Sequence, residues 1–140
     1  MRVLLILGSN LGNRKENIER AIGLIKKFAG KILAESSLLE TPPFGVLNQP
    51  AFLNKGVLIE THHPPTELLN LLKWIEKRAG RYPTYRWGPR VIDVDVATYG
   101  NVRVKTEKLK LPHPGLWERE FFRKIYEEVM REPLPLPPPA

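Results

Sequence analysis

The stretch Val3-Leu4-Leu5-Ile6-Leu7, followed at once by Gly8-Ser9-Asn10, decides how this chain begins to fold. Five apolar residues in succession, without alternation, are typical of a strand that is covered on both faces. The run is shorter than a secretory signal peptide requires and far shorter than a membrane span of about 20 residues. We therefore predict a central, buried strand at the start of the chain.

A helix is predicted directly after this strand, over residues 14–29. Asn13 and Glu16 have the spacing of a capping box, and Gly30 is typical of a residue that ends a helix. Between them, apolar residues recur at helical spacing. These residues are Ile18, Ala21, Ile22, Ile25, Phe28 and Ala29.

The rest of the chain continues this alternation of strands and helices. The expected elements are strands at 31–40 and 51–61, a helix that starts at Pro64-Pro65 and ends at Gly80, a loop at 81–89, a strand at 90–99, a short hairpin and a last amphipathic helix through Phe121, Phe122, Ile125 and Val129. The order β-α-β-β-α-β predicts an α+β, ferredoxin-like antiparallel sheet with two helices on one face, plus a C-terminal extension. We expect a single domain over residues 1–132 and a Pro-rich tail, 133–140, that frays.

Composition limits the possible functions. A chain of 140 residues suits one domain, and the lack of cysteine excludes disulfides, thiolate metal sites and cysteine nucleophiles. The formal net charge of +7 favours anionic partners such as nucleotides, other phosphates, nucleic acid or an anionic membrane, although a basic surface alone explains it equally well. Because we find no targeting signal, we expect the protein in the cytoplasm.

Asp93 and Asp95 give the strongest sign of chemistry. Residues two apart in a strand point from the same face, so the two carboxylates are expected side by side. A divalent cation removes their mutual repulsion, and Mg²⁺ binds one or two carboxylates together with water and phosphate oxygens. Taken alone, the pair also fits an exposed strand face with two solvated aspartates.

The segment 81–90 contains Arg81, Arg86 and Arg90 and no acidic residue. Guanidinium groups bind phosphate oxygens through a planar fork, so a mobile loop of this kind is suited to close over a triphosphate. Trp87 is placed to exclude water from such a site. The alternative is a flexible basic loop on the surface.

Four further residues are candidates for binding. His113 stands between two prolines, where it either donates to a phosphate or serves the structure alone. Glu76 lies near the apolar face of the second helix, either as a partly buried carboxylate near the metals or as a charge at its boundary. Phe52 and Asn54 share one strand face, which suits stacking and pairing with a flat, nitrogen-rich heterocycle; Phe52 fits a core position as well.

These segments, in this order, resemble the 6-hydroxymethyl-7,8-dihydropterin pyrophosphokinases of folate biosynthesis. The segments that carry the resemblance are Gly8–Gly12, Thr41–Gly45, Gln49–Asn54, Arg86–Arg90 with Asp93 and Asp95, and Pro112-His113. They span residues 1 to about 122, and the arginine-tryptophan run with its two aspartates is the most specific part.

The resemblance implies transfer of the β,γ-diphosphate of ATP to the pterin hydroxymethyl group, with release of AMP. It implies that Asp93 and Asp95 hold two Mg²⁺ ions and that Arg81, Arg90 and Asp95 take part in catalysis. The residues expected to bind ATP are Glu76, Arg81, Arg86, Trp87, Arg90, Lys108, His113 and Arg119. The residues expected to bind the pterin are Thr41, Pro42, Phe44, Phe52, Asn54 and Phe121, with the ring between the last phenylalanine and Phe52.

A second hypothesis is an RNA-binding module without catalysis, which would share the fold, the net charge and the basic loop. Against it, the sheet lacks the paired aromatic signature of such modules. Asp93 and Asp95 would also repel a phosphate backbone in the absence of metal. We therefore expect small-molecule substrates, no nucleic acid, no membrane association and a monomer.

Overall fold

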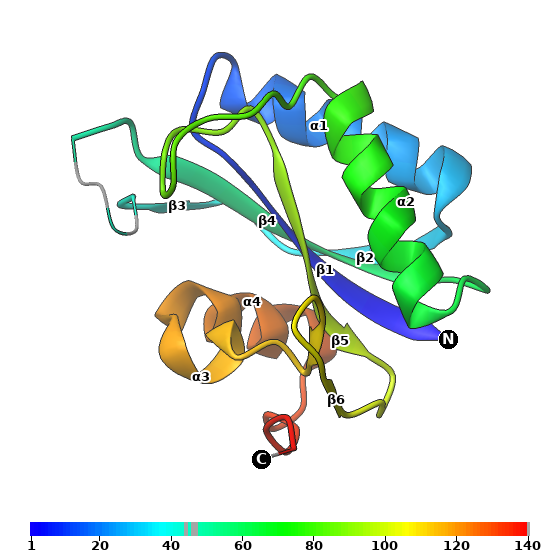
Figure 1. Ribbon diagram of the computed structural model, residues 1–140. Coiled ribbons are helices and arrows are strands. Elements are labelled where there is room, and N and C mark those ends of the chain that lie inside the picture. Colours follow the sequence, from blue (N-terminus) through cyan, green and yellow to red (C-terminus); the bar gives the residue numbers. More distant parts are fainter. Residues whose placement is uncertain (44, 46–47, 140) are drawn as a thin grey trace.

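The computed structural model describes residues 1–43, 45 and 48–139 and is built on an antiparallel sheet (Figure 1). Its strands are β1 (Arg2–Ser9), β2 (Lys31–Glu35), β3 (Leu39–Thr41), β4 (Phe52–Glu60) and β5 (Asp93–Tyr99). The strand order is β2-β4-β1-β5, with β3 paired to β4, and all the pairs are antiparallel. This is the order of a ferredoxin-like α+β fold, so that prediction is confirmed.

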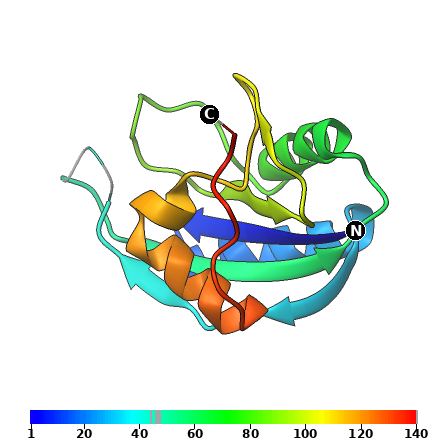
Figure 2. The same cartoon turned by 90° about the horizontal axis from the view of Figure 1, so that it is seen from below.

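Helices cover both faces of this sheet. The remaining elements are the helices α1 (Arg14–Phe28), α2 (Pro65–Arg78), α3 (Gly115–Glu118) and α4 (Glu120–Met130) and the hairpin strands β6 (Val104–Lys105) and β7 (Lys110–Leu111). As predicted, α1 and α2 lie on one face, whereas α4 packs on the opposite face (Figures 1 and 2). The short helix α3 was not predicted.

The first strand is the centre of the sheet, as its apolar run predicts. Val3, Leu5 and Leu7 are buried under α1 and α2, and Leu4 and Ile6 are buried on the side of α4. None of these five side chains is more than 2% exposed. Because β1 contributes side chains to both cores, the buried side chains of the neighbouring strands are also divided between the α1/α2 face and the α4 face of the sheet.

The helix ends also follow local sequence rules. The side chain of Asn13 accepts the backbone N–H of Glu16 at 3.1 Å, which confirms the predicted cap of α1. The second helix, α2, begins at Pro65. Its last turn is followed by Gly80, whose φ of +111° is readily adopted only by glycine.

Two predicted strands are wrong in their extent. The strand expected at 31–40 is broken, because Ser36 bonds to Gly56 through its backbone N–H and also through its side-chain oxygen, which accepts Gly56 N–H at 2.8 Å. The ladder resumes in β3 only at Leu39. The strand expected from residue 90 begins instead at Asp93, because the backbone of Arg90 pairs with Asn10 in the loop after β1.

The tail has neither helix nor strand over residues 133–139 and contacts the rest of the chain; that it frays stays a prediction. Arg103 donates from Nε and Nη2 to the carbonyl oxygen of Pro137, at 3.1 and 2.9 Å. Tyr126 donates to Glu132 at 3.0 Å, and Leu134 packs against the core under α4. The prolines lack backbone N–H groups, but their carbonyls remain available to hold the tail on the hairpin side.

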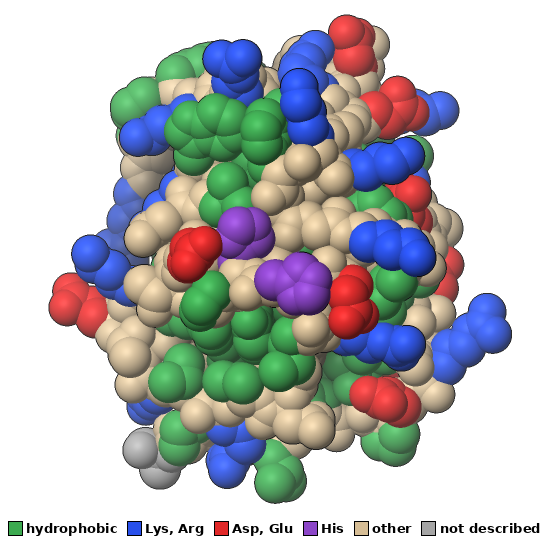
Figure 3. All heavy atoms as spheres, turned by 90° about the vertical axis from the view of Figure 1, so that its right-hand side faces the viewer, with side chains coloured by type: hydrophobic (Ala, Val, Ile, Leu, Met, Phe, Trp, Pro, Cys, Tyr) green, Lys and Arg blue, Asp and Glu red, His purple; other side chains and the backbone are tan. Residues whose placement is uncertain are grey.

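On the face shown in Figure 3, Lys and Arg side chains are interspersed with acidic and apolar ones. Among the described residues, no helix is long and apolar enough to cross a membrane.

Candidate active site

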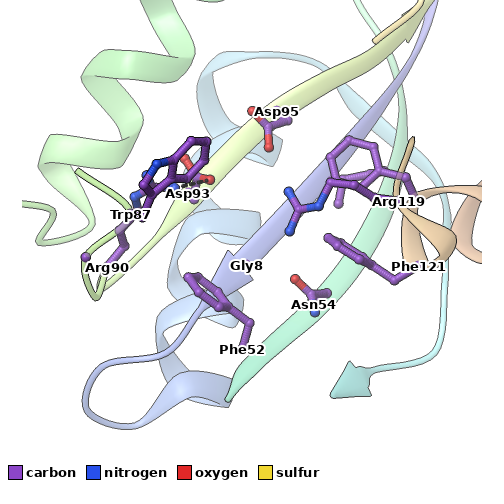
Figure 4. Close-up of a pocket in the computed structure, with 12 residues that line it drawn as sticks. Gly8, Phe52, Asn54, Trp87, Arg90, Asp93, Asp95, Arg119 and Phe121 are labelled. Atoms are coloured by element: carbon purple, nitrogen blue, oxygen red, sulfur yellow. Dashed lines mark hydrogen bonds and ion pairs between the residues drawn. The ribbon is translucent and has the colours of Figure 1, made fainter. Parts of the chain in front are cut away.

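The two aspartates project from the face of β5 that is turned toward α4. Asp93 lies opposite Gly8 and Asp95 lies opposite Ile6 in the ladder with β1. Val94, between them, is buried in the core under α1 and α2. The predicted side-by-side arrangement is therefore confirmed, and both carboxylates line one cavity (Figure 4).

This cavity gathers residues from distant parts of the chain. β4 supplies Phe52 and Asn54, the loop after α2 supplies Trp87 and Arg90, and the start of α4 supplies Phe121 (Figure 4). Its lining consists of Ile6, Gly8, Phe52, Asn54, Trp87, Gly88, Arg90, Asp93, Asp95, Arg119, Phe121 and Phe122. Residues expected for ATP and residues expected for the pterin thus share one space.

Two arginines from the ends of the basic loop hold Asp93. Arg81 Nη1 donates to Asp93 Oδ1 at 3.0 Å, and Arg90 Nη1 donates to Asp93 Oδ2 at 3.1 Å. Both oxygens of this carboxylate therefore have a cationic partner. The two ends of the basic loop are therefore both bonded to Asp93, through Arg81 and Arg90.

Glu76 is a buried carboxylate beneath this pair, with 7% of its surface exposed. Its Oε2 accepts the backbone N–H of Val94 at 2.7 Å and Arg81 Nη1 at 2.8 Å. Burial, together with the charge of Asp93, raises the pKa of Glu76 to about 7. Of the two interpretations left open by the sequence, the partly buried carboxylate near the aspartates is the one observed.

The charged form of Asp95 is also unfavourable in this site. Desolvation raises the pKa of Asp95 well above its ordinary value, and the charges of Asp93 and Glu76 act in the same direction. A cation would relieve this repulsion, so the donor set fits a hard ion such as Mg²⁺. Within the described ranges, no three or more His, Cys, Asp or Glu residues are grouped so that they could hold a metal ion.

His113 faces the same carboxylate in a fixed orientation. The backbone N–H of Gly115 donates to His113 Nδ1 at 2.9 Å, so the neutral ring carries its proton on Nε2. That nitrogen lies 4.0 Å from Asp95 Oδ1. Desolvation and the charge of Arg119 lower the pKa of His113, which favours the neutral ring with a donor directed into the site.

A second cavity, of about 420 Å³, opens between α2, the hairpin and β5. It is lined by Leu69, Val94, Asp95, Val96, Glu107, Lys108, Leu109, Lys110, His113, Pro114 and Glu118. Lys108 and His113 were expected near ATP, and both are found here. The apolar walls formed by Leu69 and Leu109 were missed, because their sequence neighbourhoods do not indicate that the hairpin lies beside α2.

Asn54 presents a fixed hydrogen-bond acceptor to the main cavity. Its Nδ2 donates to Leu39 O at 3.1 Å and to Thr41 Oγ1 at 2.8 Å. The carboxamide oxygen is consequently on the side of Gly8, as Figure 4 shows. A group with N–H donors fits this position better than one with acceptors.

The two expected stacking residues line the cavity from different elements. Figure 4 shows Phe52 at the β4 side and Phe121 at the α4 side, with open space between them. The guanidinium of Arg119 lies 4.5 Å from the ring centre of Phe121. Thr41 and Pro42 line an adjoining hollow that also includes Phe121.

Arg86, which was expected to bind ATP, is not brought into either of these two cavities. Arg86 is exposed, and its guanidinium lies 5.3 Å from the ring centre of Trp87. Phe44 falls outside the described residues. Trp87 itself has a φ of 62°, an uncommon conformation for a bulky side chain that is often found at functional sites.

Sequence reasoning also missed two amide side chains, Asn10 and Gln49. The interpretation of the sequence assigned Asn10 no role beyond its place in the segment Gly8–Gly12, although the structure shows it 1% exposed and hydrogen-bonded to distant loops. Polar residues are common in turns between a strand and a helix, so nothing in the local sequence distinguished Asn10 from an ordinary turn residue.

Comparisons with known proteins agree on one family. A family model described as 7,8-dihydro-6-hydroxymethylpterin-pyrophosphokinase (HPPK) matches residues 4–131. A Bacillus subtilis protein named 2-amino-4-hydroxy-6-hydroxymethyldihydropteridine pyrophosphokinase is 38% identical over 127 residues, which is 90% of this chain and 76% of that protein. An Aquifex aeolicus protein of the same name is 40% identical over 131 residues, or 94% of this chain and 80% of that protein.

Longer proteins match as well. A mitochondrial folate synthesis bifunctional protein of Arabidopsis thaliana is 44% identical over 119 residues, which is 85% of this chain but 22% of that protein. The chain thus spans less than a quarter of the length of this plant relative. The crystal structure of Plasmodium falciparum HPPK-DHPS has the same fold, with a TM-score of 0.75 at 16% identity over 96% of this chain and 42% of that one. The RNA-binding alternative receives no support from these matches.

Proposed function

Because the chain belongs to the 7,8-dihydro-6-hydroxymethylpterin-pyrophosphokinase family, we propose that it transfers the diphosphate of ATP to the hydroxymethyl group of 6-hydroxymethyl-7,8-dihydropterin and releases AMP. One observation carries the proposal: Asp93 and Asp95 line the same cavity as Phe52 and Asn54. Groups suited to metal and phosphate therefore face groups suited to a flat heterocycle.

Asp93 and Asp95 are the residues that hold Mg²⁺ in this proposal, and we assign two ions to the pair. The raised pKa of Asp95 supports a cation here, since the protein's own positive charges leave this carboxylate incompletely compensated. When bound, Mg²⁺ would neutralise the negative charge on the phosphate oxygens and orient the triphosphate.

The arginines supply the remaining positive charge. Arg81 and Arg90 stand beside Asp93, within reach of any phosphate that approaches the carboxylates. Guanidinium groups stabilise the charge that spreads over the transferred phosphoryl oxygens. The Nε2–H of His113 adds a neutral donor. Arg119 lines the main cavity and also an adjoining cavity that contains Arg81 and His113.

The transfer itself is an in-line displacement. The pterin hydroxyl oxygen forms a bond to the β-phosphorus, while the bond from that phosphorus to the oxygen bridging the α- and β-phosphates breaks. AMP leaves with this bonding pair. Asp95 is the carboxylate that we assign to receive the hydroxyl proton, because both oxygens of Asp93 already accept from arginines.

On the pterin side, Phe52 and Phe121 stack on the ring and the oxygen of Asn54 accepts from its N–H groups. Trp87 lies over the same cavity and excludes water from the transferred group. On the nucleotide side, Leu69, Leu109 and the hairpin lysines line the space for the nucleoside.

Glu76 has a different role from the one that the resemblance implies. Because it is buried and bonded to Val94 N–H and Arg81, we propose that it acts by holding these groups rather than by contacting ATP.

The test is an assay of AMP release from ATP. We expect release to require both Mg²⁺ and the reduced hydroxymethylpterin, with one pterin diphosphate formed for each AMP. AMP release that is independent of the pterin would contradict the proposal. Affinity for ATP that depends on Mg²⁺ and is unchanged by added RNA separates this function from the RNA-binding alternative.

A further inference from the structure

Asn10 joins three loops through one buried side chain. It lies between β1 and α1 and is 1% exposed. Its Nδ2 donates to Gln49 Oε1 at 2.8 Å and to Pro50 O at 3.1 Å. Its Oδ1 accepts the backbone N–H of Arg90 at 2.7 Å, and its own backbone N–H donates to Arg90 O at 3.0 Å. These loops gather on one side of the molecule, at the left of Figure 1.

The connection continues on both sides of Asn10. Gln49 Nε2 donates to Trp87 O at 2.7 Å, so the loop before β4 also holds the middle of the basic loop. Arg90 Nη1 in turn donates to Asp93 Oδ2. A series of hydrogen bonds therefore leads from the loop that precedes Phe52 to the acidic pair.

We propose that Asn10 is a positioning residue that couples the nucleotide side of this site to the pterin side. The inference rests on the proposed function, and Asn10 itself lines none of the described cavities. A nucleotide that orders Arg90 and Trp87 also restrains Gln49 and Pro50, and the pterin pocket then requires less ordering. By linkage, the pterin must tighten nucleotide binding by the same factor.

The chemistry of this position requires an amide. Asparagine supplies two donors and an acceptor on a short side chain, whereas aspartate has the same shape but no donor. In Asn10→Asp, the oxygen atoms of Gln49 and Pro50 face a carboxylate oxygen, while the acceptor for Arg90 N–H is retained. The substitution therefore breaks both bonds from Asn10 to the loop before β4 and keeps its bond to the basic loop; the bond from Gln49 to Trp87 does not involve Asn10.

Two other variants complete the design. Gln49→Ala removes the bonds of Gln49 to Asn10 and to Trp87 and keeps the bond from Asn10 to Pro50. Gln49 is half-buried in a loop, where loss of the folded state is not expected. Thr61→Val is the matched control, because Thr61 is 2% exposed and its hydroxyl donates to Ala29 O at 2.7 Å. It lies at the end of the sheet where its backbone N–H donates to Met1 O.

The experiment is calorimetric titration of the hydroxymethylpterin with and without a non-hydrolysable Mg-ATP analogue, and the reverse titration. We expect the analogue to tighten pterin binding in the unaltered protein by about 5-fold or more. Asn10→Asp and Gln49→Ala each remove two of the hydrogen bonds that the loop before β4 makes in this series. We therefore expect the ratio to fall toward one in both variants and to remain unchanged in Thr61→Val.

Retention of the coupling ratio in both site variants overturns the inference. Equal weakening of both ligands with an unchanged ratio also overturns it, because that result indicates a merely structural amide. If the unaltered protein binds both ligands independently, Asn10 couples nothing and the proposed function stands. If it binds neither ligand, the proposed function fails first and the inference fails with it.

Discussion

Arg81 and Glu76 form an ion pair in which Arg81 Nη1 lies 2.8 Å from Glu76 Oε2. The same nitrogen reaches Asp93 Oδ1 at 3.0 Å, and the same Glu76 oxygen accepts Val94 N–H. The end of α2, the start of the basic loop and the strand of the acidic pair therefore meet at one buried carboxylate. Its protonation state has consequences for the stability of the whole site.

We expect Glu76 to make the ligand-free protein less stable as pH rises. Its folded-state pKa is raised from 4.5 to about 7, so between these values the folded protein keeps a proton that the unfolded chain releases. Stability falls across this window and is constant above it. Glu76→Gln should remove the loss, with a gain of up to about 3 kcal/mol at pH 8 relative to pH 4.5.

Urea unfolding at several pH values measures this difference. Glu19→Gln, at an exposed position of α1, is the control and should follow the unaltered protein. Parallel pH profiles for Glu76→Gln and the unaltered protein would show that the raised pKa is not a property of this carboxylate.

Asp95→Asn is expected to separate activity from stability. Loss of a metal ligand should slow diphosphate transfer on the order of a thousandfold or more. The same change removes a desolvated carboxylate with a raised pKa, so the melting temperature of the ligand-free protein at pH 8 should rise. Near-normal rates for both Asp95→Asn and Asp93→Asn would rule out the proposed metal site.

Gly8→Ala should weaken pterin binding selectively. A Cβ at this position would lie 2.9 Å from Asn54 Oδ1 and 3.4 Å from Phe52 Cδ1, so it crowds the acceptor and the stacking ring. Such crowding typically costs about 1–3 kcal/mol, or roughly 10- to 100-fold in affinity. Titration with the pterin and with the Mg-ATP analogue compares the two ligands, and only the first should be affected.

Gly23→Ala is the control for that substitution. An added Cβ there meets no atom within 4 Å, and the position lies within α1. We expect it to stabilise the protein by about 0.5–1 kcal/mol and to leave both affinities unchanged. Equal losses of both ligands in Gly8→Ala would instead indicate a folding defect.

The basic loop should become protected when nucleotide binds. Arg86 is exposed and Trp87 is 40% exposed, and the segment 81–90 contains neither helix nor strand. A Mg-ATP analogue supplies further anionic oxygens to this loop, so trypsin cleavage after Arg81 and Arg86 should slow. Unchanged cleavage at saturating analogue would contradict an ordering role for this loop.

Tryptophan emission offers an independent measurement of the same event. With Trp74→Phe and Trp117→Phe, the signal comes from Trp87 alone. We expect its emission to shift on addition of the analogue with Mg²⁺ and to stay unchanged with Mg²⁺ alone.

Much of the fold was determined by the sequence through short-range patterns. The unbroken run Val3–Leu7 predicted a strand buried on both faces, and Asn13 predicted the start of α1; both are confirmed. The spacing of Asp93 and Asp95 determined that their carboxylates share a face, because successive strand residues alternate. The family resemblance, too, was carried by segments that can be read along the chain.

Only the tertiary structure decided which of these segments meet. Asn10 bonds to Gln49 and to Arg90, which are 39 and 80 residues away, and Glu76 holds Val94 across 18 residues. The same long-range pairing interrupts the predicted strand at Ser36, 20 residues before its partner Gly56. Such hydrogen bonds depend on the packing of whole elements, which fixes distances and orientations that local spacing does not encode.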